Sequence, residues 1–265
     1  MATESPRYAP APPLSPDPVT TSHPAEYRIW RPLENRLLAV KIVFCLIVGV
    51  WIVAVVSGVF ELRLANRAVA GENIAPSVLS ASDTRQMFMG WVQWTLWVAG
   101  AVAFIMWLYR AYQNVDATDP GQRRYGYGWA IGSWFVPILN LWRPKMIVND
   151  VWRAGQNPGD PGFLLIAWWL LWLANGFVAS SARRVYNNAD TPEEWRTGIV
   201  RYLVADGTGA VAALLAVLVV VKLTRNLNAR AQAADGSLFR DSSREAPTDA
   251  PSVMTMTPSE TPTGR

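Results

Sequence analysis

Three polar side chains could do chemistry inside the most apolar parts of this chain: Gln93, Asn175 and Asp206. A polar group in hydrocarbon is costly, so such residues either join one helix to another or mark the path of a solute. For the two amides we favour helix packing. Asp206 lies near the edge of its apolar run, one turn after Tyr202, and fits either an outer vestibule or a position that faces water.

A second group of residues surrounds an aromatic, proline-interrupted stretch in the middle of the chain. Arg110, Asn140, Arg143 and Lys145 are predicted to meet at one membrane face if this stretch returns to the side from which it enters. Cations in that setting would bind an anionic lipid headgroup or another anionic ligand. The alternative is structural, because Pro137 frees a backbone carbonyl that Asn140 or Arg110 would satisfy.

The composition argues against an enzyme. The chain of 265 residues has one histidine, His23, and one cysteine, Cys45, so it can form no internal disulfide and no thiolate metal site. The apolar runs show no acid pair, no Ser–His set and no Gly-rich phosphate loop. Four further acids are expected at turns or caps: Asp116, Asp119, Asp150 and Asp160. We therefore expect no catalytic residue, no cofactor and no metal.

Four long apolar runs must position these side chains. The chain is 51% hydrophobic and only 17% charged, whereas soluble domains carry about 25% charged residues. The runs cover residues 42–60, 87–109, 162–182 and 203–221, and each is long enough to cross the roughly 30 Å hydrocarbon core as a helix. We predict an all-α membrane protein with four transmembrane helices.

The aromatic stretch 128–145 differs from these runs. It holds Pro137 and Pro144, and its apolar part is too short for an ordinary span. We predict a re-entrant or interfacial segment, followed by an amphipathic helix with Ile147, Val148 and Val151 on one side. The same segment, 129–144, would be the gate if the protein is a carrier.

The connections and tails complete the predicted organisation. Residues 61–86 are predicted to form a polar loop, with a helix start at Ser82. A capping box at Thr191 predicts a helix that runs through the fourth span to Arg230. The predicted domains are a disordered Pro-rich tail over 1–34, a membrane domain over 35–230 and a disordered Ser/Thr/Pro-rich tail over 231–265.

The net charge of +4 fits cytoplasmic loops and anionic lipid headgroups better than nucleic acid, because no basic helix or aromatic RNA-binding motif accompanies it. The excess of lysine and arginine on the predicted cytoplasmic side is larger if the chain has four spans than if it has five. The positive-inside rule therefore predicts four spans with both termini cytoplasmic.

Three stretches carry a resemblance: WLYRAYQN at 107–114, GWAIGSWFVPILNLWRP at 128–144 and DVWR at 150–153. Together they resemble a membrane-protein family of actinobacteria, domain of unknown function 4328 (DUF4328), over roughly residues 40–230. The resemblance implies a multi-span protein of the bacterial plasma membrane, often with a Pro-rich cytoplasmic tail. It implies no activity.

Two functions fit the sequence. The first is a non-enzymatic scaffold or accessory protein, anchored by the bundle, whose Pro-rich tails bind protein partners. The alternative is a carrier or channel for a small solute or lipid. A water-accessible cavity that reaches Gln93, Asn140 or Asn175 would favour the carrier, and a dry, tightly packed bundle would favour the scaffold.

Overall fold

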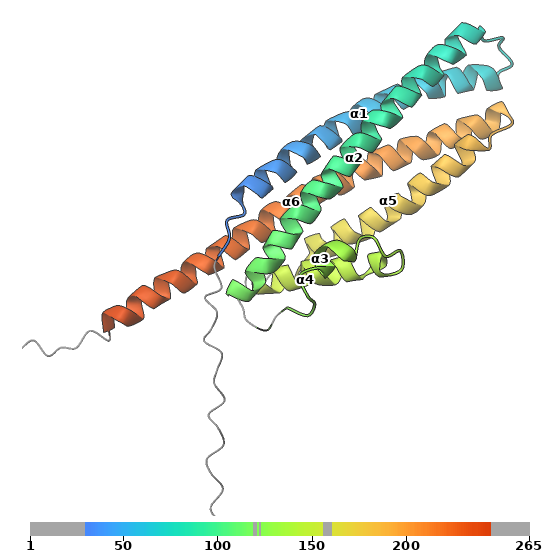
Figure 1. The fold of residues 1–265 in the computed structure, drawn as a ribbon. Coiled ribbons are helices and arrows are strands. Elements are labelled where there is room, and N and C mark those ends of the chain that lie inside the picture. Colours follow the sequence, from blue (N-terminus) through green and yellow to red (C-terminus); the bar gives the residue numbers. More distant parts are fainter. Residues whose placement is uncertain (1–29, 119–120, 122, 156–160, 245–265) are drawn as a thin grey trace, which may run out of the picture.

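The described part of the chain is built of helices alone. The computed structural model in Figure 1 describes residues 30–118, 121, 123–155 and 161–244. Its long helices are α1 (Glu34–Val69), α2 (Pro76–Thr118), α5 (Phe163–Asn187) and α6 (Pro192–Arg244), and its short ones are α3 (Trp129–Gly132), the 3-10 helix η1 (Leu139–Leu141) and α4 (Arg143–Ala154). Four helices are long and apolar enough to cross a membrane. The predicted all-α, four-span fold is confirmed.

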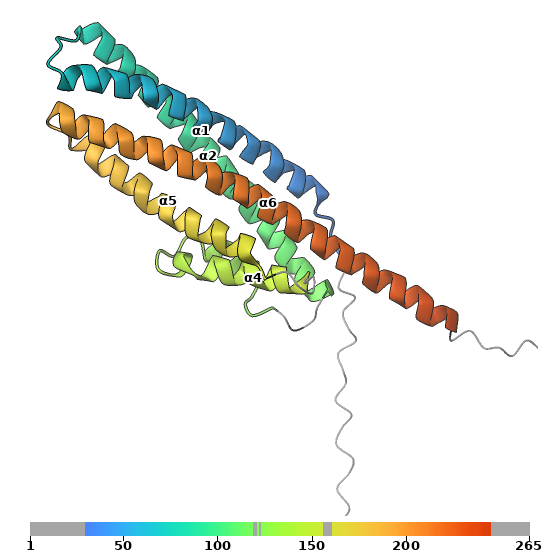
Figure 2. The same cartoon turned by 180° about the vertical axis from the view of Figure 1, so that it is seen from behind.

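The four long helices form two hairpins whose turns lie at the same end of the bundle. We call this the hairpin end, formed by residues 70–75 and 188–191, and the opposite end the tail end. The tail end carries the start of α1, the last turns of α2, and helices α3 and α4, and α6 extends beyond it (Figures 1 and 2). Helix α6 packs along both α1 and α5, and α1 packs along α2.

The aromatic stretch stays at the tail end. Between α2 and α5 the chain forms α3, a turn, η1 and α4, none of which is long enough to span a membrane (Figure 1). Pro144 occupies the first turn of α4, where a missing backbone donor costs little. The predicted amphipathic helix is present, because Ile147, Val148 and Val151 are all fully buried.

The hydrophobic core is concentrated at the tail end. Trp107 and Tyr112 of α2 are fully buried there, and Trp107 Nε1 donates a hydrogen bond of 2.9 Å to Thr224 Oγ1 of α6. By contrast, large side chains on the spans face outward, and Phe177 is 71% exposed. In water such a surface would favour association, whereas in a bilayer it meets acyl chains.

Two predicted boundaries are wrong. Residues 61–86 are helical on both sides of a short turn at 70–75, since Glu61, Leu64 and Ala65 are buried and carry α1 past its apolar run. The proline at 76 then begins α2, a position that suits its fixed φ. Helix α6 continues beyond Arg230 to Arg244, and its first residues there include the alanines at 231, 233 and 234, which favour a helix.

The predicted tails fall mostly on residues 1–29 and 245–265, which lie outside the described residues. The last part of the predicted N-terminal tail packs on the bundle instead. Leu33 is fully buried, and the Asn114 side chain exchanges two hydrogen bonds with the backbone of Arg31, at 2.7 and 3.2 Å.

The capping box at the start of α6 is confirmed. The backbone N–H of Glu194 donates to Thr191 Oγ1 at 3.2 Å, and the Glu194 carboxylate accepts from the N–H of Asp190 at 2.9 Å. Beyond this cap, α5 and α6 approach so closely that a Cβ atom added to Gly198 would lie 2.8 Å from Tyr186 Cα. Glycine at 198 therefore sets the spacing of this hairpin.

Replacing Gly198 by alanine should push α5 and α6 apart. Overpacking against backbone typically costs about 1–3 kcal/mol, so we expect a lower midpoint of thermal unfolding for the purified protein in detergent. Gly207→Ala is the matched control, since nothing lies within 4 Å of its added Cβ. This control should be neutral or slightly stabilising. Equal midpoints for both variants would contradict the close approach at Gly198.

Candidate functional site

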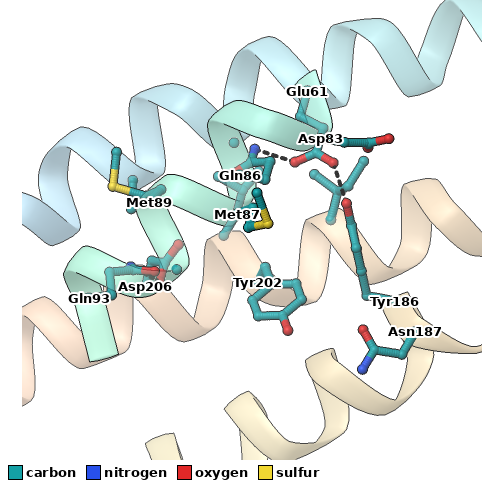
Figure 3. Close-up of a pocket in the computed structure, with 15 residues that line it drawn as sticks. Glu61, Asp83, Gln86, Met87, Met89, Gln93, Tyr186, Asn187, Tyr202 and Asp206 are labelled. Atoms are coloured by element: carbon teal, nitrogen blue, oxygen red, sulfur yellow. Dashed lines mark hydrogen bonds between the residues drawn. The ribbon is translucent and has the colours of Figure 1, made fainter. Parts of the chain in front are cut away.

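A polar cavity of about 370 Å³ lies among all four long helices near the hairpin end (Figure 3). We call it the hairpin-end cavity. Its lining includes Glu61 from α1, Gln93 from α2, Tyr186 from α5, and Tyr202 and Asp206 from α6. The helix contacts that bring these residues together are those of α6 with α1 and α5 and of α1 with α2. The cavity is therefore a product of the whole bundle.

Glu61 is a buried acid of the cavity, with only 4% of its surface exposed. The Tyr186 hydroxyl donates to Oε1 of Glu61 at 2.7 Å, and the Gln86 amide donates to Oε2. Both carboxylate oxygens thus accept hydrogen bonds from neutral donors (Figure 3). These contacts hold the carboxylate in place, and the cation that acts on it is Arg85.

Asp206 and Gln93 form a second polar pair deeper in the bundle. Gln93 Nε2 donates a hydrogen bond of 2.9 Å to Asp206 Oδ1, which joins α2 to α6 (Figure 3). Both residues were singled out from the sequence. The structure brings them together on the cavity wall, where Asp206 lies one turn from Tyr202, so the pair both connects helices and faces a cavity.

The ionisable acids and bases of the cavity lining are all acids. Glu61, Asp83 and Asp206 contribute three carboxyl groups, and no lysine, arginine or histidine is found among the described residues that line the cavity. Arg85 lies outside the lining, where it hydrogen-bonds Ser82 Oγ at 3.1 Å and attracts the Glu61 carboxylate. The rings of Tyr186 and Tyr202 pack edge to face, with centroids 5.4 Å apart. Carboxylates beside aromatic rings form an environment suited to a cation.

Asn175 does not line the cavity. Its amide donates to the Ala205 carbonyl at 2.7 Å and to Thr208 Oγ1 at 3.0 Å, so it joins α5 to α6. It lies beside Gly209, whose missing side chain makes room for Trp51 and Asn175. In the described structure Asn175 thus connects two helices.

The four residues around the aromatic stretch make separate contacts. Arg143 stacks over the rings of Trp129 and Tyr125, at 4.2 and 4.8 Å from their centroids. Lys145 donates to Asn149 Oδ1 at 2.7 Å, one turn further along α4, and burial lowers the pKa of its ammonium group. The described structure thus pairs Arg143 with aromatic rings and Lys145 with its own helix.

Arg110 and Asn140 have polar atoms without partners. Among the described residues, neither Arg110 Nε nor Asn140 Oδ1 makes a hydrogen bond. Asn140 lines a second cavity, which is apolar and lies between the aromatic stretch and the four long helices.

Asp150 has a role that the sequence did not predict. It is not at a cap but fully buried inside α4, where its Oδ1 lies 3.2 Å from Arg124 Nε and its Oδ2 accepts from the Tyr112 hydroxyl at 3.4 Å. Burial raises the pKa of the Asp150 carboxyl above its ordinary value, against the lowering effect of Arg124 and Tyr112. Asp116 is likewise buried within α2 and pairs with Arg123 at 2.9 Å.

Sequence reasoning missed Glu61, Tyr186 and Gln86 as site residues. Glu61 and Gln86 fall in the stretch predicted as a polar loop, and Tyr186 follows the third apolar run, so no membrane context drew attention to them. Helical spacing gives a signal in retrospect. The buried residues Ala54, Ser57 and Glu61 succeed one another at intervals of three and then four, which is the spacing of one helix face.

Comparison with known proteins gives one match. The model of a family described as domain of unknown function (DUF4328) matches residues 70–225, more than half of the chain. No curated protein and no solved structure matches. The matched range contains α2 to α5, most of α6 and the whole aromatic stretch.

The buried Asp150 carboxyl predicts a pH dependence of stability. Because its pKa is raised in the folded protein, its stabilising contribution is full below the ordinary value of 3.8 and is lost as pH rises through the raised pKa. The free energy of unfolding of the wild type should therefore fall, relative to that of Asp150→Asn, as pH rises from about 4. Chemical unfolding in detergent at several pH values measures both curves.

Asp190→Asn is the control, since Asp190 is exposed in the turn between α5 and α6. Its curve should run parallel to that of the wild type. Parallel curves for the wild type and Asp150→Asn would contradict the raised pKa.

Proposed function

We propose a function from the geometry of the bundle, because the chain belongs to the DUF4328 family, whose description assigns no activity. The protein is proposed to be a membrane carrier for a small organic cation, which binds in the hairpin-end cavity. The observation that carries this proposal is a polar cavity of about 370 Å³ that reaches Gln93 and Asp206 inside a bundle of membrane-spanning length.

The positions of Glu61 and Asp206 support a role for both acids in binding a solute. Ionisable groups within spanning helices are rare, face the bundle interior or a water-filled cavity, and mark substrate or ion pathways. Asp206 lies within the fourth apolar run, and Glu61 lies directly after the first. A bundle that needed only stability would place apolar residues there, since these pack in lipid without desolvating a charge.

The chemistry of the lining supports a cation as the solute. The hydrogen-bond partners of Glu61 and Asp206 are neutral tyrosine and glutamine side chains. A bound cation would neutralise the carboxylates, and the rings of Tyr186 and Tyr202 would add cation–π attraction of about 0.5–2 kcal/mol.

Release at the opposite face requires a movement, because the fully buried Trp107 and Tyr112 fill the tail-end core. In this proposal the segment 129–144 acts as the gate, since its two prolines and short helices allow movement without breaking a continuous helix.

The scaffold hypothesis rests on the two tails, most of which lie outside the described residues. A cavity at Gln93 and a second one at Asn140 are the features that favour a carrier over a scaffold. We further propose that the protein lies in the bacterial plasma membrane with its tail end and both termini in the cytoplasm, because lysine and arginine are more numerous on that side.

A matched pair of probes tests the proposal. Choline is a small organic cation, and 3,3-dimethyl-1-butanol has the same shape without the charge. Equilibrium binding to the purified full chain should be detectable for choline and much weaker for the neutral probe. Glu61→Gln and Asp206→Asn should each reduce choline binding about tenfold, as expected for the loss of a charge partner worth about 1.4 kcal/mol.

Arg201→Gln serves as the control, because Arg201 donates to Ser181 Oγ outside the cavity lining. This variant should bind choline like the wild type. Uptake of choline into liposomes that contain the protein then separates a carrier from a binding protein. Equal binding of the charged and neutral probes, or no effect of either acid, would overturn the proposed cation site.

A further inference from the structure

We propose that the second cavity holds one acyl chain of an anionic glycerophospholipid, whose polar head lies at the tail end near Arg143. We call it the aromatic cavity, defined by Trp97, Trp134, Asn140, Trp172 and Ala213 in its lining. This site is separate from the hairpin-end cavity and does not depend on the proposed transport of a cation.

The size and lining of the aromatic cavity suit a lipid chain. Its volume is about 430 Å³, within the range of about 300–1,000 Å³ typical of ligand sites. Apolar and aromatic side chains dominate the wall, with alanines on α6 that leave room between the helices. The only described amide in the lining is that of Asn140, so the body of the occupant must be apolar.

The bilayer is the natural source of such an occupant. Trp97 and Phe135 line the cavity and are also 54% and 73% exposed on the outer surface of the bundle. The cavity therefore borders the face that meets lipid, and a chain can enter sideways without crossing water.

Two buried polar atoms at the aromatic stretch call for a polar group at one end of that chain. The indole Nε1 of Trp134 has no acceptor, and Oδ1 of Asn140 has no donor, among the described residues. Trp134 is fixed by edge-to-face contacts of 5.7 Å with both Phe104 and Trp172, so its N–H cannot easily turn elsewhere. Unpaired buried groups cost about 1–3 kcal/mol each, and in the proposed complex the cavity wall shifts so that ester and hydroxyl groups of the lipid satisfy both.

The charges beyond this end select an anionic head. Arg143 is three residues from Asn140, so their backbones are at most about 11 Å apart. Arg110 lies five residues beyond the cavity-lining Ile105 on α2, about 7.5 Å along the helix, and its charged neighbours are Arg36 and Arg31. Each cation near a lipid phosphate is worth about 1 kcal/mol. Lys145 is left out of this site because Asn149 already binds it.

Native mass spectrometry of the full chain tests the site. The purified protein is exchanged into an equal mixture of phosphatidylglycerol and phosphatidylcholine with identical chains, and the retained lipid is identified. We expect one retained copy, with phosphatidylglycerol favoured. Arg143→Gln should reduce that preference about fivefold. The charge-matched control Lys145→Gln should leave it unchanged.

Substitutions in the lining of the aromatic cavity test whether the acyl chain of the lipid binds there. Ala213→Phe places a ring inside the cavity and should abolish retention, whereas Val211→Phe, at an exposed position on the same helix, should not. Trp134→Phe keeps the ring and removes only the N–H, so it should weaken retention severalfold even if Ala213→Phe does not fold. Retention that is unchanged in a folded Ala213→Phe or in Trp134→Phe would overturn the cavity site. Equal loss of preference in Arg143→Gln and Lys145→Gln would overturn the assigned head position.

Discussion

The structure depends on one constraint: in hydrocarbon a backbone has no water to bond, so each crossing must satisfy its own N–H and C=O groups as a helix. Four helices of the described chain meet this condition by length and composition. The same solvent reverses the usual rule for side chains, because Phe177 and Phe88 are exposed at 71% and 68% without cost in lipid. Polar groups are then costly on the outside and must be gathered between the helices.

This constraint explains where the two cavities lie. Glu61, Gln93 and Asp206 face inward at the hairpin end, where the helices enclose a polar volume. Toward the tail end aromatic side chains gather in the interior, with Trp107 hydrogen-bonded to Thr224 and Trp134 packed edge to face on Phe104 of α2 and Trp172 of α5. The two cavities thus differ along the axis of the bundle: the one near the hairpin end carries carboxyl groups, and the one that the aromatic stretch borders is lined mainly by apolar side chains.

The four spans and the broken aromatic stretch could be predicted from the sequence because hydropathy and proline act locally. The buried face of α4 could be predicted for the same reason, since Ile147, Val148 and Val151 recur at helical spacing. Gln93 and Asp206 were recognised as polar groups in apolar runs. Their mutual hydrogen bond was not, because a contact between residues 113 positions apart depends on the packing of α2 on α6.

Other features were hidden for physical reasons that a single sequence does not reveal. Glu61 was assigned to a loop because a charged residue ends an apolar run, yet α1 continues past it and Tyr186 and Gln86 satisfy its carboxylate. Asp150 was assigned to a turn or cap because acids usually lie there. Its burial follows from Arg124 and Tyr112, which approach from the loop and from α2.

We propose that the aromatic stretch enters and leaves the membrane at the tail end of the bundle. Single cysteines placed at Gly128, Leu139 and Lys145 in a Cys45→Ser background, and labelled with a membrane-impermeant thiol reagent, test it most directly. We predict that the cysteines at 128 and 145 react only from the cytoplasmic side, in oriented vesicles of known sidedness. Labelling of one from the cytoplasm and of the other from outside would make the stretch a fifth crossing and contradict the account.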